Sequence, residues 1–203
     1  MKIVTISREY GSGGRELGKR IAAALGFSYY DKEILTELAA RTDLDEKYVE
    51  KVLESGIKPN YGMAFGHASA FVTASVASQT DILVAEQKLV KEIGAKCDCV
   101  IVGRNASVTL SEHKPFRIFV YGDLPSKIER CRKRSPEDDA LTDKELTAKM
   151  KKMDNARANL RRLTAGTEWG ERGGYDLMVN TSGADFDAIV PLIAQYAMAK
   201  FNK

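Results

Sequence analysis

A cluster of glycines directly follows the first apolar segment of the chain, and it constrains the fold more than any other feature of the sequence. The run Lys2-Ile-Val-Thr-Ile-Ser7 is rich in β-branched residues and predicts a buried strand. Gly11-Ser-Gly-Gly14 follows, and a helical spacing of apolar residues then extends from 15 to 25 and ends at Gly26. A turn of this kind presents backbone N–H groups and the positive end of a helix dipole to an anion such as phosphate.

This turn does not match the standard nucleotide-binding patterns. The pattern G-x-x-x-x-G-K-[ST] requires a lysine after its last glycine. If Gly13 takes that last position, Gly14 stands where the lysine belongs, and Arg15 and Glu16 follow. The dinucleotide pattern G-x-G-x-x-G fails as well, because Glu16 replaces its third glycine. Two interpretations stay open: a phosphate-binding loop, or a tight turn that requires glycine only for its backbone angles.

The remaining chain alternates short apolar segments with helical patterns. We predict strands at 27–30, 99–102, 116–121 and 176–180. We predict helices at 32–41, 43–54, 68–93, 125–134, 142–162 and 185–201, with loops at 55–66 and 135–139. This alternation is typical of an α/β fold in which a parallel sheet lies between two helical layers. Ligands of such sheets bind at the carboxyl ends of the strands, where the glycine cluster, Asp31 and Gly103-Arg104 fall.

Composition excludes several classes of protein. A hydrophobic share of 44% and a charged share of 29% are those of an ordinary globular chain. No segment approaches the ~20 apolar residues of a membrane span, and the first residues do not form a signal peptide. The three cysteines lack a C-x-x-C pair and the two histidines are scattered, so neither a disulfide framework nor a metal centre is indicated. We therefore expect one cytoplasmic domain, residues 1–203.

The net charge of +3 conceals an uneven distribution. Between residues 114 and 172 there are 15 basic and 10 acidic residues, so the rest of the chain has a net charge of −2. A basic segment suits an enzyme with anionic substrates, and it is also typical of solvent-exposed helices. The modest total charge and the lack of RNA-binding motifs argue against a nucleic-acid partner.

Five ordered blocks of sequence span nearly the whole chain: Ile-Ser-Arg-Glu-Tyr-Gly-Ser-Gly-Gly-Arg-Glu-Leu-Gly (6–18), Tyr-Tyr-Asp-Lys (29–32), Val-Ile-Val-Gly-Arg-Asn (100–105), Met-Asp-Asn-Ala-Arg (153–157) and Tyr-Asp-Leu-Met-Val-Asn-Thr-Ser (175–182). Together they resemble the cytidylate kinase-like family, relatives of cytidylate kinases among the P-loop nucleoside monophosphate kinases. The resemblance implies a fold of the P-loop nucleoside triphosphate hydrolase type, with a lid at about 130–142 and a small acceptor-binding insert at about 55–80. It also implies phosphoryl transfer from ATP, with Mg²⁺, to a nucleoside monophosphate such as CMP or dCMP. The segment 62–78 is open to a second interpretation, an association surface of a homo-oligomer.

The resemblance also implies roles for individual residues. The residues expected to bind ATP are Gly11, Ser12, Gly13, Gly14, Arg15 and Glu16, and Arg15 would supply the charge of the missing lysine. The residues expected to bind the acceptor are Asp31, Arg104, Asp154 and Arg157. Arg130 and Arg134 would act with Arg15 in catalysis, when the lid brings them onto the transferring phosphoryl group. Asp31 or Glu16 would hold Mg²⁺ through water, because both lie near the predicted phosphate loop.

Each of these roles has a structural alternative. Asp31 is equally suited to cap the helix at 32–41, and Arg15 to lie exposed on the first turn of its helix. Asp154 and Arg157 have the i, i+3 spacing of an ordinary helix-surface ion pair, and arginines on long basic helices are commonly solvated. Trp169 is expected to be a packing residue.

Departures from the family pattern bear on the acceptor and on catalysis. Asn105 stands where cytidylate kinases have the aspartate of a Gly-Arg-Asp motif, and Lys32 and Glu37 replace a serine and an arginine. Specificity for CMP therefore does not follow from the resemblance. The missing loop lysine supports a second hypothesis, a nucleotide-binding regulatory protein that has lost catalysis.

Overall fold

The computed structural model describes residues 1–55 and 70–202, and within these ranges a five-stranded parallel sheet forms the centre of the molecule. The strands are β1 (Ile3–Arg8), β2 (Ser28–Tyr30), β3 (Cys99–Val102), β4 (Phe116–Tyr121) and β5 (Leu177–Asn180). Their order across the sheet is β2-β3-β1-β4-β5, and each neighbouring pair is parallel. The predicted α/β fold with a parallel sheet is confirmed.

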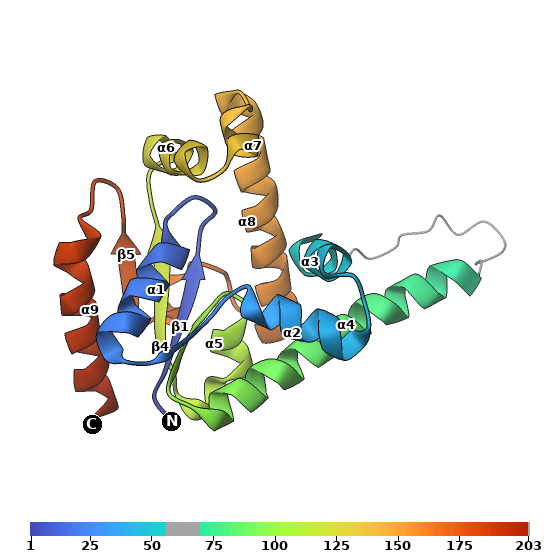
Figure 1. Ribbon diagram of the computed structural model, residues 1–203, viewed down its shortest axis with the longest axis horizontal. Helices are drawn as coiled ribbons and strands as arrows, with labels where there is room; N and C mark the ends of the chain where they lie inside the picture. The colour runs from blue at the N-terminus through green and yellow to red at the C-terminus, as the bar shows by residue number, and fades with distance from the viewer. Residues whose placement is uncertain (56–69, 203) are drawn as a thin grey trace.

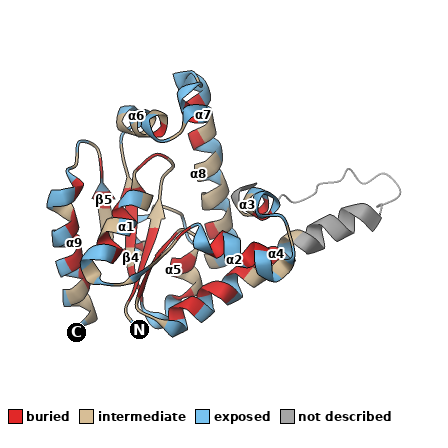
Figure 2. Cartoon of the chain, in the orientation of Figure 1, coloured by how far each residue is buried: buried red, intermediate tan, exposed pale blue. Residues whose placement is uncertain are grey.

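Helices cover both faces of this sheet (Figure 1). One face is covered by α1 (Gly14–Leu25) and α9 (Phe186–Phe201), and the other by α2 (Glu33–Thr42), α4 (Ala70–Lys96) and α5 (Ala106–Thr109). Helix α3 (Glu46–Ser55) packs on α2 and α4. Successive residues of β1 point to opposite faces, so Val4 and Ile6 pack with α1 and α9, whereas Ile3 packs with α2 and α4. The central strands β1 and β4 are accordingly mostly buried (Figure 2).

A separate group of helices stands beyond the carboxyl ends of the strands. It consists of α6 (Leu124–Arg134), α7 (Pro136–Asp139) and α8 (Asp143–Ala165). These helices share a small core of Cys131, Leu146 and Met150, against which Tyr10 of the loop after β1 also packs. Short 3₁₀ turns at Ser111–His113 and Arg172–Gly174 precede β4 and β5.

The loop predicted at 135–139 and the helix-cap alternative for Asp31 are wrong. Residues 135–139 were predicted as a polar loop, yet Pro136–Asp139 forms the turn of helix α7. Proline at a first helical position and acidic residues in the first turn both favour a helix start there. Asp31 does not cap a helix, because α2 begins at Glu33 and its N-cap position is Lys32, without a side-chain bond.

The boundaries predicted for the helix at 68–93 also differ from the structure. Helix α4 continues through Gly94 to Lys96. Gly94 lies inside the helix and does not end it, because Leu110 packs closely against the helix at this position. A Cβ at Gly94 would lie 2.7 Å from Cδ2 of Leu110. No helix among the described residues is long and apolar enough to cross a membrane. The insert predicted at 55–80 falls mostly outside the described residues.

The packing role predicted for Trp169 is confirmed. Its ring meets the ring of Phe119 edge-on, with 5.0 Å between the centroids, and Tyr175 packs against Phe119 at the same distance. This aromatic cluster covers the β4 side opposite to α1 and α9 and anchors the chain between α8 and β5.

Candidate functional site

The glycine-rich turn between β1 and α1 has the backbone geometry of an anion-binding loop. Gly11 and Gly13 adopt left-handed angles, with φ of +79° and +78°, which side chains other than glycine rarely tolerate. The hydroxyl of Ser12 donates to the carbonyl of Glu9 at 2.9 Å and stabilises the turn from within. Gly13 is the N-cap of α1, and no described side chain bonds to this helix end. The N–H groups of the first turn of α1 therefore remain available to a ligand.

Two side chains from later in the sequence, one after β5 and one on α6, bond to this loop. The Oγ1 of Thr181, which directly follows β5, donates to the Ser12 carbonyl at 2.7 Å. The guanidinium of Arg130 on α6 donates to the carbonyl of Gly11 at 3.3 Å and also to the carbonyl of Thr181. Two loop carbonyls, those of Gly11 and Ser12, are thus bonded by side chains from other parts of the chain.

Arg8, the last residue of β1, lies along the floor between this loop and the end of β3. Its stem occupies the space beside Gly14, where an added Cβ would lie 2.6 Å from the Cβ of Arg8. Its head occupies the space beside Gly103, where an added Cβ would overlap Nη1. The Arg8 side chain is only 15% exposed. Burial and the nearby charge of Arg157 hold the pKa of Arg8 well below its usual value.

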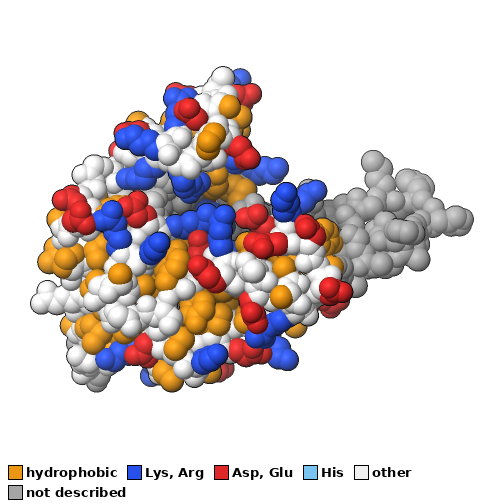
Figure 3. Space-filling view, viewed as in Figure 1, with side chains coloured by type: hydrophobic (Ala, Val, Ile, Leu, Met, Phe, Trp, Pro, Cys, Tyr) orange, Lys and Arg blue, Asp and Glu red, His pale blue; other side chains and the backbone are white. Residues whose placement is uncertain are grey.

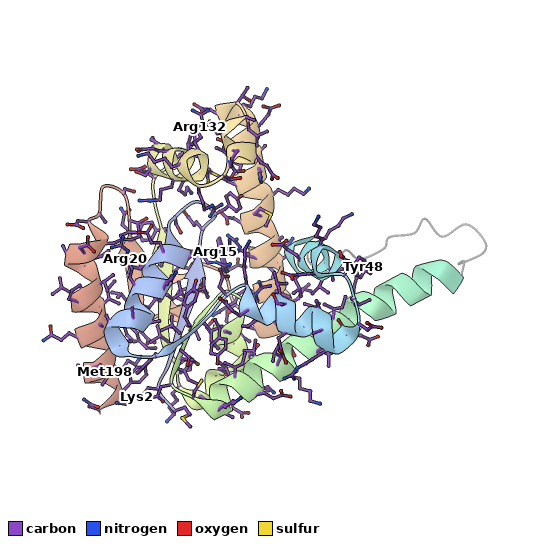
Figure 4. The ribbon with its side chains drawn as sticks, in the orientation of Figure 1. Lys2, Arg15, Arg20, Tyr48, Arg132 and Met198 are labelled. Carbon is purple, nitrogen blue, oxygen red and sulfur yellow. The ribbon has the colours of Figure 1, made fainter. Side chains whose placement is uncertain are left out.

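Asp31 joins the turn after β2 to the first turn of α1. Its buried carboxylate lies 2.6 Å from Nε of Arg15 and 4.0 Å from Nη2 of Arg8. In the part of the chain that the structure describes, Oδ1 of Asp31 has no hydrogen-bond partner. Figure 4 shows Arg15 projecting from α1 toward the centre of the molecule, whereas Arg20 lies further along α1, where it pairs with Asp187 of α9.

Arg104 follows β3 in a turn of three left-handed residues. The φ angles are +78° at Gly103, +55° at Arg104 and +48° at Asn105. Nη1 of Arg104 lies 3.4 Å from Oε1 of Glu86, and Nη2 lies 3.4 Å from the carbonyl of Asp31. Burial raises the pKa of Glu86, although Arg104 opposes this shift. The side chain of Asn105 donates to Thr164 of α8 at 2.5 Å, so it faces that helix.

Asp154 and Arg157 of α8 form the predicted i, i+3 ion pair, at 2.8 Å, and the same pair contacts the loop. Oδ1 of Asp154 accepts from the backbone N–H of Tyr10 at 2.8 Å. Nη1 of Arg157 donates to the carbonyl of Arg8 at 3.1 Å. The pair therefore joins α8 to the loop after β1.

The predicted lid arginine Arg134 lies above the ring of Tyr10, 5.4 Å from its centroid. Its guanidinium is 3.7 Å from Oδ2 of Asp138, a buried residue of α7 that also accepts from Lys149 at 2.6 Å. The hydroxyl of Tyr10 donates to the same carboxylate at 3.2 Å. In this structure, Arg134 is thus held at the junction of α7, α8 and the loop.

These groups surround one cleft of about 1220 Å³ at the carboxyl ends of the strands. Figure 3 shows Lys and Arg side chains gathered at a hollow between the α6–α7 region and the body of the molecule. The predicted site residues that line the cleft are Gly11, Gly13, Gly14, Arg15, Glu16, Arg104, Arg130, Arg134 and Arg157. The other three, Ser12, Asp31 and Asp154, do not line it but contact Glu9, Arg15 and Arg157, which do.

A sequence model of the cytidylate kinase-like family matches residues 3–183. The chain belongs to this family. The resemblance seen in the five sequence blocks is confirmed, and the family indicates nucleotide-dependent phosphoryl transfer. None of the curated proteins compared with the chain matches it.

Solved structures share the fold of this kinase-like chain. An uncharacterized protein from Eubacterium ventriosum has 24% identity and a TM-score of 0.69, over 97% of this chain and 98% of that one. A shikimate kinase from Acinetobacter baumannii has 10% identity and a TM-score of 0.57, over 100% and 96%. A gluconokinase from Sinorhizobium meliloti has 14% identity and a TM-score of 0.54, over 98% and 93%. The fold is that of the P-loop kinases, as predicted.

The loop fits the phosphates of a nucleotide better than it fits a metal ion by itself. Its left-handed glycines and uncapped helix end suit phosphate oxygens. Among residues 1–55 and 70–202, no three His, Cys, Asp or Glu side chains form a group able to hold a metal. Glu16 and Asp31 are each engaged by an arginine, at 2.6 Å. A Mg²⁺ held mainly by nucleotide phosphates needs only one or two carboxylates, so these residues suit metal that arrives with ATP.

Sequence reasoning did not assign roles to four residues that define the cleft: Arg8, Tyr10, Glu86 and Lys149. A charged residue at the carboxyl end of a buried parallel strand was the signal available for Arg8. Glu86 lies in a long helical pattern that gave no sign of its burial. The contacts of Tyr10 and Lys149 depend on how α8 packs over the loop.

Proposed function

We propose that the protein transfers the γ-phosphoryl group of ATP to a nucleoside monophosphate, with CMP or dCMP as the first acceptors to test. The state of Arg104 supports an anionic acceptor most directly. Its side chain is 11% exposed, its two polar contacts are both 3.4 Å long, and its buried Nε has no partner among the described residues. A buried guanidinium with such incomplete partners calls for an anion, and the phosphate of a nucleoside monophosphate supplies one.

The donor would bind at the loop. The backbone of Gly11, Ser12, Gly13 and Gly14 would surround its phosphates, with Arg15 and Glu16 beside them at the start of α1. No side chain needs to act as a nucleophile, because an acceptor phosphate oxygen attacks the γ-phosphorus while the bond to the oxygen of ADP breaks. The protein's contribution is then positioning and electrostatic stabilisation.

The acceptor would bind between β3 and α8. Arg104 and Arg157 would contact its phosphate, Asp154 would orient Arg157, and Asp31 would act through its ion pair with Arg15. Closure of the lid at about 130–142 would move Arg130 and Arg134 from their present partners onto the transferring phosphoryl group.

The test is ADP formation from ATP and Mg²⁺ with a panel of acceptors. The panel contains CMP, dCMP, UMP, AMP and GMP, together with shikimate and gluconate because of the structural neighbours. We expect turnover that depends on one nucleotide and collapses in Arg104→Ala. Arg41→Ala, which removes an exposed arginine of α2 paired with Glu37 and Glu92, is the control and should keep full activity.

Two results would contradict the proposal in different ways. Turnover only with shikimate, gluconate or another non-nucleotide would keep the kinase and replace the acceptor. Tight ATP binding without turnover on any acceptor would indicate the regulatory protein that the missing loop lysine first suggested. The second alternative is not favoured, because the family and the cationic cleft are those of phosphoryl transfer.

A further inference from the structure

We propose that Arg8 replaces the missing loop lysine and contacts the γ-phosphate of bound ATP from the floor of the cleft. This inference rests on the proposed use of ATP, and it does not depend on which acceptor is used. It assigns a role in the reaction to a residue outside the glycine loop itself.

The packing of Arg8 explains why no lysine stands in the loop. Gly14 occupies the lysine position, and a Cβ there would lie 2.6 Å from Cβ and 2.9 Å from Cγ of Arg8. Contacts below 3.0 Å essentially never occur between such atoms, so a lysine at 14 and the present position of Arg8 exclude each other. The start of α1 thus has room for a side chain at position 8 or at position 14 but not at both, and in this chain the side chain is that of Arg8.

The head of Arg8 is a poorly partnered cation. Its one ion pair within the described ranges is the 4.0 Å contact with Asp31, and its guanidinium makes no hydrogen bond to another described residue. Arg157, Arg104 and Arg15 add positive charge around it. A guanidinium has five N–H donors, so a ligand with several anionic oxygens would satisfy it and offset the repulsion.

The location of the head distinguishes the terminal phosphate from the inner ones. The stem starts beside the loop at Gly14, and the head ends beside Gly103, next to the acceptor residue Arg104. The γ-phosphate is the part of ATP that lies nearest the acceptor, so a cation between the donor loop and the acceptor site contacts the γ-phosphate. Arg15 is less suited to this position, because it is 37% exposed and its Nε already bonds Asp31 at 2.6 Å.

The test measures the affinities of the full chain for ATP and ADP by calorimetry, with Mg²⁺ and without any acceptor. In Arg8→Met we expect ATP binding to weaken by about tenfold, the size of one charge-assisted contact, and ADP binding to change much less. Arg41→Met is the control and should bind both nucleotides as the unaltered chain does.

A double variant that relocates the cation tests the same idea through a gain of ATP preference, not a loss of it. Arg8→Gly combined with Gly14→Lys moves the cation into the loop, and the glycine at 8 removes the clash that bars a lysine at 14. We expect this double variant to regain the preference for ATP that Arg8→Gly alone loses. If Arg8→Met does not fold, as judged by circular dichroism, Arg8→Gln and the relocation pair decide the question.

The outcomes separate this inference from the proposed function. If the unaltered chain binds no ATP, the proposed function fails, and the role of Arg8 fails with it. If it binds ATP and Arg8→Met retains the same ratio of ATP to ADP affinity, the role of Arg8 is refuted and the proposed function stands.

Discussion

The hydroxyl of Tyr10 donates to the carboxylate of Asp138 at 3.2 Å, and this bond joins the loop after β1 directly to helix α7. The loop that would hold the donor and the segment predicted as a lid are therefore connected in this structure. Burial, followed by the charge of Asp138, raises the pKa of Tyr10, so the phenol keeps its proton at neutral pH.

Tyr10→Phe removes this bond and leaves the ring in place. Asp138 keeps its contacts with Lys149 and Arg134, so we expect the free energy of unfolding to fall by only about 1 kcal/mol. Urea unfolding measures the change. Tyr48→Phe on α3, where the side chain is exposed, should leave stability unaltered. Equal stability of the Tyr10 variant and the unaltered chain would show that the bond contributes nothing.

Gly103→Ala should disturb Arg8 through two effects. The left-handed φ of +78° disfavours alanine by about 1–2 kcal/mol, and the new Cβ overlaps the guanidinium of Arg8. We expect a lower melting temperature and weaker ATP binding. Gly183→Ala is a matched control, because its φ of +63° is also left-handed and a Cβ there meets nothing within 4 Å. A Gly103 variant with normal stability and ATP affinity would show that Arg8 moves aside without cost.

Thr181→Val tests the anchor of the loop. Valine has the same shape but cannot donate to the buried carbonyl of Ser12, which costs about 1–2 kcal/mol of stability. We also expect nucleotide affinity to drop, because the loop loses a contact that fixes it. Calorimetry and urea unfolding measure both effects. Thr36→Val, at an exposed site on α2, is the comparison, and a similar result for both variants would argue against an anchor.

Asp176 should govern part of the acid stability. Burial acts to raise its pKa, but hydrogen bonds from Arg117 and Lys200 outweigh burial and lower the pKa of Asp176 to about 2. The pKa of this carboxyl in the unfolded chain is about 4, so above that pH the ionised Asp176 stabilises the folded state by about 2 kcal/mol. This contribution disappears as the pH falls toward 2.

Unfolding of the Asp176→Asn variant by urea checks this expectation. The variant should be less stable than the unaltered chain at pH 7, and the difference should shrink between about pH 4 and pH 2. Leu163→Ala, at an exposed position on α8 without a titratable group, should show no such trend. A difference that stays constant with pH would contradict the linkage.

The sheet and its main helices follow from the sequence because apolar periodicity is a local signal. The contacts of Asp31 and Arg8 do not, because their partners come from other elements. Asp31 has the sequence context of a helix cap, and only the packing of α1 beside β2 gives it Arg15 instead. Arg8 meets Gly103 only because β3 pairs with β1, with Ile6 opposite Val102. The strand order, which no local pattern specifies, creates the centre of the site.

The pairing of β1 with β3 also fixes the distance between the glycine-rich loop and Arg104. The glycine-rich loop extends from β1 and Arg104 follows β3, so the pairing of these two adjacent strands sets the spacing between the proposed donor and acceptor sites. Movement of α6 and α7 would change how water and substrates enter, while leaving this spacing unaltered. In the proposed reaction, the distance between donor and acceptor would therefore be a property of the sheet, and movement of α6 and α7 would affect only when transfer can occur.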